Sequence, residues 1–397
     1  MYFDFMSSFP SSKDQNRPIR VLRIISRMNV GGPAVQISGL MRGLDPKSFE
    51  HKLLTGHCDE NESDYLISNA NDINVTRIDG LGRSIKPISD VIALIATIKI
   101  IREYRPDIVH THTAKAGVIG RLASILSGHH SIRVHTFHGH LLLGYFSPWK
   151  TKIIIFVEFF LGIFTKKLVA VGNKVQKDLI DAGIGNQEKF AVIPPGLVLG
   201  DVPSSKNAKK TLNLDSSYSY CSLIGRVTQI KRPDRFLKVV EELVTRKVKV
   251  KFIVAGSGEL FESTEKLIKE KSLPVLCLGW RSDIELILAA SDIVILTSDN
   301  EGTPLSLIQA GMAGVPVVST NVGSVSEIVL NQKTGLITSL NVQDLANAVQ
   351  TLIDDTALHK KLGDEAKKFT LSHFSVNRLV SDHEALYRGL ISSQAIS

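Results

Sequence analysis

Short apolar runs rich in valine and isoleucine alternate with longer amphipathic segments along most of the chain, and this alternation limits the possible folds more than any other feature of the sequence. Runs that are apolar at successive positions are typical of strands buried on both faces, and repeated strand–helix units predict parallel sheets covered by helices on both sides. The expected strands are residues 21–26, 52–55, 74–78, 107–110, 133–137, 168–171 and 190–193, then 219–224, 250–255, 275–278, 293–296, 315–319 and 335–337.

The chain is expected to form two such domains, because 397 residues exceed the size of a usual single core. Pro, Gly and Lys gather from Pro194 to Ser217 and separate the two groups of strands, as in a linker. We predict a flexible extension over residues 1–17, a Rossmann-like domain over 18–198, a linker over 199–217, a second Rossmann-like domain over 218–375 and a terminal helix over 376–397.

The bulk composition indicates a folded protein, since apolar residues make up 43% of the chain and charged residues 22%. The cysteines Cys58, Cys221 and Cys277 lie far apart without CxxC spacing, so we expect reduced thiols in the cytosol and no disulfide or zinc framework. Residues 1–17 contain no continuous apolar stretch of the kind that a signal peptide needs.

Positive charge is concentrated in the first half of the chain, where residues 1–200 contain 24 Lys and Arg against 17 Asp and Glu. This asymmetry fits an anionic partner such as a phospholipid surface, a lipid diphosphate or nucleic acid. It also fits general surface charge, and the count alone does not decide between the two.

Two segments of the first half carry apolar side chains at helical spacing. One stripe comprises Ile88, Val91, Ile92, Ile95 and Ile98. The other is the run Ile153–Phe164, which Glu158 interrupts and lysines flank. No run reaches the roughly 18 apolar residues of a spanning helix. The run therefore has two interpretations, a buried core helix or an interfacial membrane helix within Trp149–Lys167.

The stretch Asp299–Val318 predicts a ligand-binding turn in the second domain. A polar turn follows a buried strand, with Thr303 as the N-cap of the next helix and Pro304 at its first helical position. The free N–H groups of Leu305 and Ser306 would then face the edge of the sheet and favour a phosphate.

Two facing parallel sheets leave a cleft between the carboxyl ends of their strands, and polar residues recur at these ends. The first domain offers Gly31, Gly32, His110, His112, His135, His138 and His140, and the second offers Gly225, Arg226, Lys231, Gly256, Gly258, Trp280, Arg281 and Glu301. Packing alone does not account for this recurrence, which indicates a ligand site.

Motifs in both halves resemble those of a known enzyme family. The second half contains GRVTQIKRP, FIVAGSGEL and LGWRSDIELILAASDIVILTSDNEGTPLSLIQAGMAGVPVVSTNVGSVSEIV. The first half contains NVGGPAVQ, PDIVHTHTAKAG, VHTFHGH and VIPPG. From about Ile19 to Leu390 the chain is similar to the retaining glycosyltransferases of the GT-B fold, family 4. The resemblance implies two Rossmann-like domains that face a cleft, and C-terminal helices that return toward the first domain.

The resemblance implies a site for a nucleoside-diphosphate sugar. Arg226 and Lys231 match the family's phosphate-binding pair and would neutralise the charge that develops on the leaving diphosphate. The chain contains no Asp-x-Asp pattern, so we expect no catalytic metal, and we expect no other cofactor. The remaining donor-side candidates are Gly31, Gly32, Gly225, Arg281, Glu301, Gly302, Thr303, Pro304, Leu305, Ser306 and Gln309.

Glu301 matches the first glutamate of the family's E-x7-E motif, but the second position is Gln309. The Gln309 amide could still bond the ribose hydroxyls. By resemblance, retention arises from front-face attack in which the leaving phosphate helps to accept the acceptor's proton, and Glu301 positions the donor sugar.

His138 matches the family's active-site histidine and would bond the donor sugar near its anomeric carbon. His112 and His140 are expected on the acceptor side. A zinc site formed by His135, His138 and His140 is disfavoured, because His135 should lie in a strand and neither a carboxylate nor a cysteine accompanies the group.

Other functions explain less of the sequence. A UDP-sugar epimerase would need a carboxylate pair in the first domain, and a phosphorylase would need a lysine that holds pyridoxal phosphate. A non-catalytic module that binds a membrane or nucleic acid explains the charge but not Arg226, Lys231 and Glu301, and an aromatic content of 6% disfavours RNA. We predict a retaining glycosyltransferase, peripheral to the inner face of the cell membrane, that moves a sugar from a UDP-sugar to a glycolipid or polysaccharide-precursor hydroxyl without a nucleic-acid partner.

Overall fold

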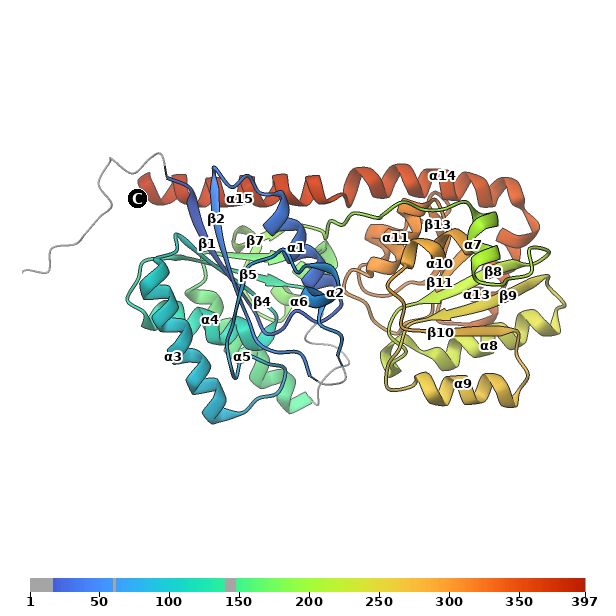
Figure 1. Cartoon of the computed structure of the whole chain (residues 1–397), viewed down its shortest axis with the longest axis horizontal. Helices are drawn as coiled ribbons and strands as arrows, with labels where there is room; N and C mark the ends of the chain where they lie inside the picture. The colour runs from blue at the N-terminus through green and yellow to red at the C-terminus, as the bar shows by residue number, and fades with distance from the viewer. Residues whose placement is uncertain (1–16, 60–61, 140–147, 397) are drawn as a thin grey trace, which may run out of the picture.

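The computed structural model describes residues 17–59, 62–139 and 148–396, which form two parallel β-sheets covered by helices (Figure 1). The first sheet has the strand order β3-β2-β1-β4-β5-β6-β7, and the second has the order β10-β9-β8-β11-β12-β13. In both sheets the order reverses after the first strands, as in doubly wound folds. The predicted fold class of two Rossmann-like domains is confirmed.

The elements of the first domain precede residue 195. Its strands are β1 (Ile19–Ile25), β2 (Phe49–Thr55), β3 (Val75–Arg77), β4 (Ile108–His112), β5 (Ile132–Phe137), β6 (Lys167–Ala170) and β7 (Phe190–Val192). Its helices are α1 (Gly32–Gly43), α2 (Tyr65–Asn69), α3 (Pro87–Tyr104), α4 (Ala114–Leu126), α5 (Pro148–Ile163), α6 (Asn173–Asp181) and the short η2 (Gln187–Lys189).

The second group of elements follows. Its strands are β8 (Ser219–Ile224), β9 (Val250–Ala255), β10 (Val275–Gly279), β11 (Ile293–Leu296), β12 (Val317–Thr320) and β13 (Gly335–Thr338). Its helices are α7 (Ser205–Thr211), η3 (Gln229–Lys231), α8 (Pro233–Thr245), α9 (Phe261–Glu270), α10 (Ile284–Ala290), α11 (Leu305–Ala313), α12 (Val325–Ile328), α13 (Val342–Asp354), α14 (Thr356–His373) and α15 (Val376–Ile396).

The predicted bounds of β8, β9 and β11 agree with the structure, whereas β4 is longer than predicted. This strand continues to His112, so His110 and His112 lie inside it and not beyond its end. Both side chains are buried, and His110 contacts the Tyr387 hydroxyl of α15, 277 residues away.

Helices α1 and α15 cover one face of the first sheet, and α3 and α4 cover the other. Leu40 of α1 and Leu379 of α15 share a cluster with Val21 of β1. The next residue of β1, Leu22, packs in a cluster with Ala93 of α3. Because successive side chains of a strand point to opposite faces, one strand contributes to both layers.

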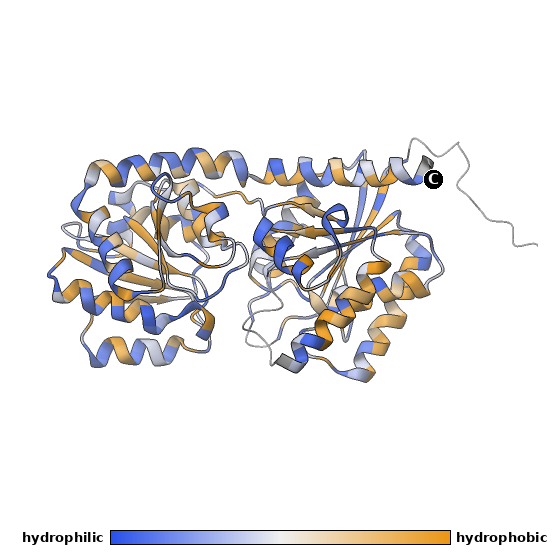
Figure 2. Cartoon of the chain, turned by 180° about the vertical axis from the view of Figure 1, so that it is seen from behind, coloured by the Kyte–Doolittle hydropathy of each residue, from blue (hydrophilic) through white to orange (hydrophobic). Residues whose placement is uncertain are grey.

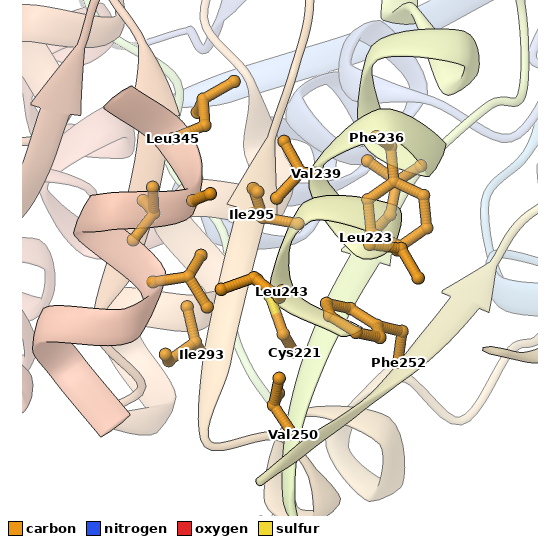
Figure 3. Packing of buried hydrophobic residues seen from close by; sticks show 14 of the residues in the cluster. Cys221, Leu223, Phe236, Val239, Leu243, Val250, Phe252, Ile293, Ile295 and Leu345 are labelled. Atoms are coloured by element: carbon orange, nitrogen blue, oxygen red, sulfur yellow. The ribbon is translucent and has the colours of Figure 1, made fainter. Parts of the chain in front are cut away.

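Figure 3 shows the core between the second sheet and helices α8 and α13. Phe236 of α8 meets Phe252 of β9 edge to face, with ring centroids 5.9 Å apart. Ile295 of β11 and Leu345 of α13 belong to the same cluster. Cys221 is also buried here, and burial raises the pKa of its thiol. The three cysteines are unpaired.

Helices α14 and α15 connect the two domains along one side of the molecule (Figure 1). Helix α14 packs on α11 of the second domain, and α15 packs on α1 of the first. Tyr387 of α15 is completely buried in the core of the first domain. The chain also crosses between the domains at Leu197, whose N–H donates to the Phe374 carbonyl at 3.0 Å.

The stretch predicted as a linker contains helix α7, which packs against α10. Ala208 of α7 and Ala289 of α10 share a cluster. Lys209 donates to Asp292 at 3.0 Å. This part of the stretch is therefore attached to the second domain.

The two apolar segments of the first half form helices, but their apolar side chains face outward. Ile88 of α3 is 80% exposed, and Phe156 of α5 is 70% exposed. These exposures exclude the interpretation of Ile153–Phe164 as a buried core helix. Among its described side chains, α5 turns Glu158 and Leu161 inward.

A buried ion pair attaches α5 to α4. Arg121 Nη2 donates to the two carboxylate oxygens of Glu158 at 2.8 and 2.7 Å, and Arg121 Nε donates to the Gly117 carbonyl at 2.7 Å. The two charged side chains are 0% and 2% exposed. Because water does not reach the pair, each charge depends on the other for its stabilisation.

Replacing Glu158 by alanine should lower the free energy of unfolding by about 3–5 kcal/mol, because Arg121 would keep its charge without a counter-ion. Urea unfolding followed by circular dichroism measures this loss. The control is Asp181→Ala, which removes one partner of the exposed pair Lys177–Asp181 and should leave the midpoint nearly unchanged. An equally small change in both variants would contradict the importance of the buried pair.

Candidate active site

The carboxyl ends of the two sheets meet at a contact between glycine backbones. A methyl group on Gly302, beyond β11, would come within 2.8 Å of Gly139 Cα, beyond β5. A methyl group on Gly32 would lie 3.6 Å from the Leu305 side chain of the other domain. Gly31 precedes it as the N-cap of α1, in an extended conformation. The small residues let the two domains approach each other where polar groups gather.

Glu301 is held in place within the second domain. Lys231 Nζ donates to Glu301 Oε1 at 2.6 Å, and Ser298 Oγ donates to the same oxygen at 2.5 Å. Gly323, with φ of +53°, packs against the same turn, and a methyl group there would meet the Glu301 carbonyl oxygen at 1.7 Å. None of the described residues donates to Glu301 Oε2, so this oxygen is available to a ligand.

The predicted basic residues differ in their surroundings. Arg226 is exposed, follows Gly225 at the end of β8, and has no partner among the described residues. Arg281 instead makes a two-pronged contact with Asp283, at 2.7 and 2.5 Å, and this hydrogen bonding lowers the pKa of Asp283. Arg226 is therefore the cation without a partner here, whereas Lys231 is paired with Glu301 and Arg281 with Asp283.

Asp299 ties the turn before Glu301 to helix α8. It accepts from Arg232 Nη1 at 2.8 Å and from Arg235 Nη2 at 2.7 Å. Burial raises the pKa of Asp299, but the hydrogen bonds from the two arginines outweigh burial and lower the pKa overall. The turn is thus fixed to α8 by charge-assisted bonds.

Helix α11 begins one residue later than predicted. Its N-cap is Pro304, with an extended ψ of 109°, so the predictions of Thr303 as the cap and Pro304 as the first helical residue are wrong. The Thr303 hydroxyl donates across the domains to the Val171 carbonyl at 3.0 Å. It bonds this carbonyl of the first domain and does not bond the N–H groups at the start of α11. The N–H groups of Leu305 and Ser306 have no acceptor among the described residues, as in the first turn of a helix.

Gln309 lies on α11, one turn beyond these free N–H groups, and it is partly exposed. Its amide bonds to none of the described residues, so it is available to a ligand.

Gly256 and Gly258 pack too closely on neighbouring backbone for any side chain: a methyl group on Gly256 would lie 1.8 Å from the Gly225 carbonyl oxygen. They shape the turn after β9.

His138 lies just beyond β5 and contacts His112 of β4. His112 Nδ1 and His138 Nε2 are 3.0 Å apart, so one donates to the other and the two rings adopt matched tautomers. The other ring nitrogens, His138 Nδ1 and His112 Nε2, are buried and unpartnered among the described residues. His112 is 2% exposed and supports His138 from within the domain, which differs from its predicted place facing an acceptor. His140 lies outside the described residues.

A buried chain of polar groups next to the pair His112 and His138 was not predicted from the sequence. Arg23 Nη1 donates to the Tyr387 hydroxyl at 2.7 Å. Since the phenol oxygen accepts this bond, its own hydrogen is directed to His110 Nδ1, 2.6 Å away. His110 therefore carries its hydrogen on Nε2 and donates to Thr136 Oγ1 at 2.7 Å. The signal in the sequence is Arg23, a charge inside an apolar strand. The His110 ring stacks on His112 with centroids 4.3 Å apart.

Burial lowers the pKa of the histidines in this region. The pKa of His138 falls to about 4 and that of His383 to about 3. Those of His110, His112 and His135 lie well below the ordinary value, again chiefly through burial. His138 is therefore neutral at physiological pH.

A carboxylate of the second domain caps a helix of the first. Glu327 accepts from the Asn173 N–H at 2.7 Å and from the Lys174 N–H at 2.9 Å. These N–H groups begin α6, where the helix dipole favours a negative charge. A methyl group on Gly172 would lie 2.7 Å from Ser324 Oγ, so the contact requires a glycine there. No local pattern in the sequence predicts this contact, which joins residues 154 positions apart.

Within the part of the chain that the structure describes, no group of three His, Cys, Asp or Glu side chains could hold a metal ion. His135 Nδ1 bonds to Thr111 Oγ1 at 2.8 Å, and the ring packs edge-on against Phe137. The arrangement instead provides two cations, Arg226 and Lys231, and the N-terminus of α11, all of which can bind an anion. These groups suit a diphosphate.

Two family models match the chain, one in each domain. The model of Glycosyltransferase Family 4 matches residues 30–200. The model of Glycosyl transferases group 1 matches residues 204–369. The second match includes Arg226, Lys231, Glu301 and Gln309, and the first includes His138.

Known proteins are similar over most of the chain. The UDP-Gal:alpha-D-GlcNAc-diphosphoundecaprenol alpha-1,3-galactosyltransferase of Escherichia coli is 29% identical over 328 residues, 78% of this chain and 82% of that protein. The capsular polysaccharide biosynthesis glycosyltransferase CapM of Staphylococcus aureus is 24% identical over 80% of this chain and 85% of its own length. The structure of Anabaena Alr3699/HepE in complex with UDP and glucose aligns with a TM-score of 0.77 at 19% identity, over 93% of this chain and 99% of that chain, and so has the same fold.

Lys231→Ala should weaken UDP binding and lower kcat/KM with a nucleotide sugar by about 10²–10³-fold, since one preorganised charge is lost. Calorimetric titration with UDP and donor-turnover assays measure the two effects. Lys238→Ala, at an exposed position of α8, is the control and should behave as the parent. UDP affinity and turnover that survive Lys231→Ala would overturn the assignment of the diphosphate site.

The free energy of unfolding should fall as the pH is lowered from about 6.5 towards 4. In the unfolded chain the histidines take up protons in this range, whereas in the folded protein the buried histidines do not. Thermal unfolding midpoints across this range measure the slope. His383→Gln removes a histidine whose folded pKa is about 3, so the slope should be shallower. The exposed-site control His130→Gln should keep the parent's slope. A slope that His383→Gln leaves unchanged would contradict this explanation.

Proposed function

The chain belongs to the glycosyltransferases of family 4, group 1, and from this premise we propose that it is a retaining enzyme that transfers a sugar from a UDP-sugar to a glycolipid or polysaccharide-precursor hydroxyl. The observation that carries the proposal is the meeting of His138 and the Glu301 turn. A methyl group on Gly302 would lie 3.1 Å from the His138 carbonyl oxygen, and Lys231 holds the Glu301 carboxylate beside it.

The diphosphate of the donor lies at the edge of the second sheet. Arg226 and Lys231 neutralise the charge that grows on the leaving phosphate, and the free N–H groups of Leu305 and Ser306 bond its oxygens. Four donors of this kind stabilise the leaving group without a metal ion, and the enzyme uses no other cofactor. Gln309, one turn further along α11, bonds the ribose hydroxyls.

The donor sugar lies between the domains. Glu301 Oε2, which has no partner among the described residues, accepts from a sugar hydroxyl, and neutral His138 bonds the sugar near its anomeric carbon. The bond from that carbon to the phosphate oxygen breaks as the acceptor oxygen attacks from the same face. The acceptor's proton passes to the leaving phosphate. Lys231 and Ser298 hold Glu301 through Oε1, which leaves Oε2 to position the donor sugar.

UDP-galactose is the first donor to test. The relative from Escherichia coli is named for UDP-Gal, and the Anabaena structure contains UDP and glucose. The same relative is named for an acceptor on diphosphoundecaprenol, and CapM is named for capsular polysaccharide biosynthesis. We infer a lipid-linked acceptor and a site of action at the inner face of the cell membrane.

Among the described residues, no helix is long and apolar enough to cross a bilayer.

Donor turnover by the parent and two site variants tests the proposal. The parent should be stabilised against heat by UDP-sugars and should transfer the sugar to a lipid-linked acceptor, and NMR of the product should show the donor's anomeric configuration. Glu301→Ala and His138→Ala should each lose transfer by about 10²-fold or more while remaining folded. The exposed control Glu262→Ala should stay active.

Three results would count against the proposal. Full activity in either site variant would overturn the residue assignments, and an inverted product would overturn retention. Stabilisation by no nucleotide sugar would favour a non-catalytic binding module.

A further inference from the structure

The outer surface of the first domain carries large apolar side chains on two helices, α3 and α5. Exposed examples from α3 are Ile88, Ile92 and Ile95, and exposed examples from α5 are Trp149, Phe156 and Phe160. Each is about half exposed or more. Figure 2 shows the two helices as the most hydrophobic outer elements of this domain, on the side of the sheet away from α15. Apolar surface of this extent on a soluble domain marks an interaction site.

Both helices are inverted relative to the usual amphipathic pattern, in which apolar residues face the core. Helix α5 buries Glu158 against Arg121 and exposes its phenylalanines. Helix α3 buries Ala93, Thr97 and Ile101, while the larger isoleucines of its first half point outward. The outward side chains therefore add little to the core of the domain. Their exposure to water is unfavourable unless another surface covers them.

Basic residues frame this apolar surface. The segments 83–104 and 148–167 contain eight Lys and Arg against three Asp and Glu. Two of the acidic side chains are already neutralised by partners in α4: Asp90 pairs with Lys115 at 2.6 Å, and Glu158 pairs with Arg121 at 2.7 Å. The surface thus combines exposed apolar side chains with a positive rim.

Helix α5 has lysines at both of its ends. Lys150 and Lys152 are exposed in its first turns, and Lys166 is exposed just beyond its last turn. Long cationic side chains at the ends of an apolar helix face can reach lipid phosphates while the apolar side chains enter the bilayer boundary. This charge complementarity favours an anionic bilayer as the occupant of the surface.

We propose that the outer faces of α3 and α5 together dock on a bilayer containing anionic lipids, with both helices parallel to the membrane plane. This proposal rests on the proposed function in one respect, that a lipid-linked acceptor is delivered at such a surface. The docking itself depends only on the two helices and their lysines.

Vesicle flotation tests the docking without reference to catalysis. The parent should float with phosphatidylcholine vesicles that contain phosphatidylglycerol, and binding should weaken in high salt. The pair Ile88→Ser with Ile92→Ser and the pair Phe156→Ser with Phe160→Ser should each lower binding by about tenfold or more, since each loses two large apolar side chains. Lys150→Gln with Lys152→Gln should lower binding to anionic vesicles about 25-fold, from about fivefold per charge.

The matched control is Ile67→Ser, which removes a side chain that is 79% exposed on α2 of the same domain but outside this surface. It should float as the parent does. Circular dichroism checks that every variant is folded, and turnover with a water-soluble acceptor should be the same in all of them. If the parent shows no turnover with the water-soluble acceptor, this result would count against the proposed function and leave the docking result valid.

The proposal is overturned if the parent remains with the unbound protein at low salt. It is also overturned if both serine pairs float as the parent does. A third contrary outcome is a dimer that the same substitutions dissociate without any vesicle binding, because the surface would then be an interface between copies of the chain.

Discussion

The ion pair between Lys231 and Glu301 joins the two strand ends on which the candidate site depends. Lys231 follows β8 and Glu301 follows β11, and these strands are neighbours in the second sheet. The pair is largely shielded from water, so its attraction is stronger than that of a surface pair and fixes both side chains. In the proposed donor complex, a diphosphate between Arg226 and the start of α11 would find Lys231 already positioned. The site therefore needs little rearrangement to bind charge.

The remaining contacts of the cleft hold the first domain against this pair. Glu327 caps α6, Thr303 bonds the Val171 carbonyl, and Gly302 lies on Gly139. Helix α15 adds support from within the first domain, since Tyr387 fixes His110, which stacks on His112. His138 thus stands on a network that begins more than 200 residues away in sequence.

Local patterns in the sequence were enough to predict the strands, the two domains and the polar residues at the strand ends. Parallel strands place their carboxyl ends on one edge of the sheet, so the sequence could predict that Lys231 and Glu301 lie on the same edge. The errors have non-local causes. Thr303 is not a cap because Val171 offers it a partner, and His112 is buried because β4 is longer than its apolar run. The periodicity of Ile88–Ile98 predicted a helix, but periodicity does not say which side faces the core. In α5, the bond between Arg121 and Glu158 holds the Glu158 side of the helix toward the core.

A crystal structure of the protein with UDP tests the proposed position of the nucleotide most directly. The expected result is a diphosphate within hydrogen-bond distance of Lys231 Nζ and of the N–H groups of Leu305 and Ser306, with the ribose beside Gln309. A nucleotide bound away from the carboxyl edge of the second sheet, or a diphosphate that Lys231 does not contact, would contradict it.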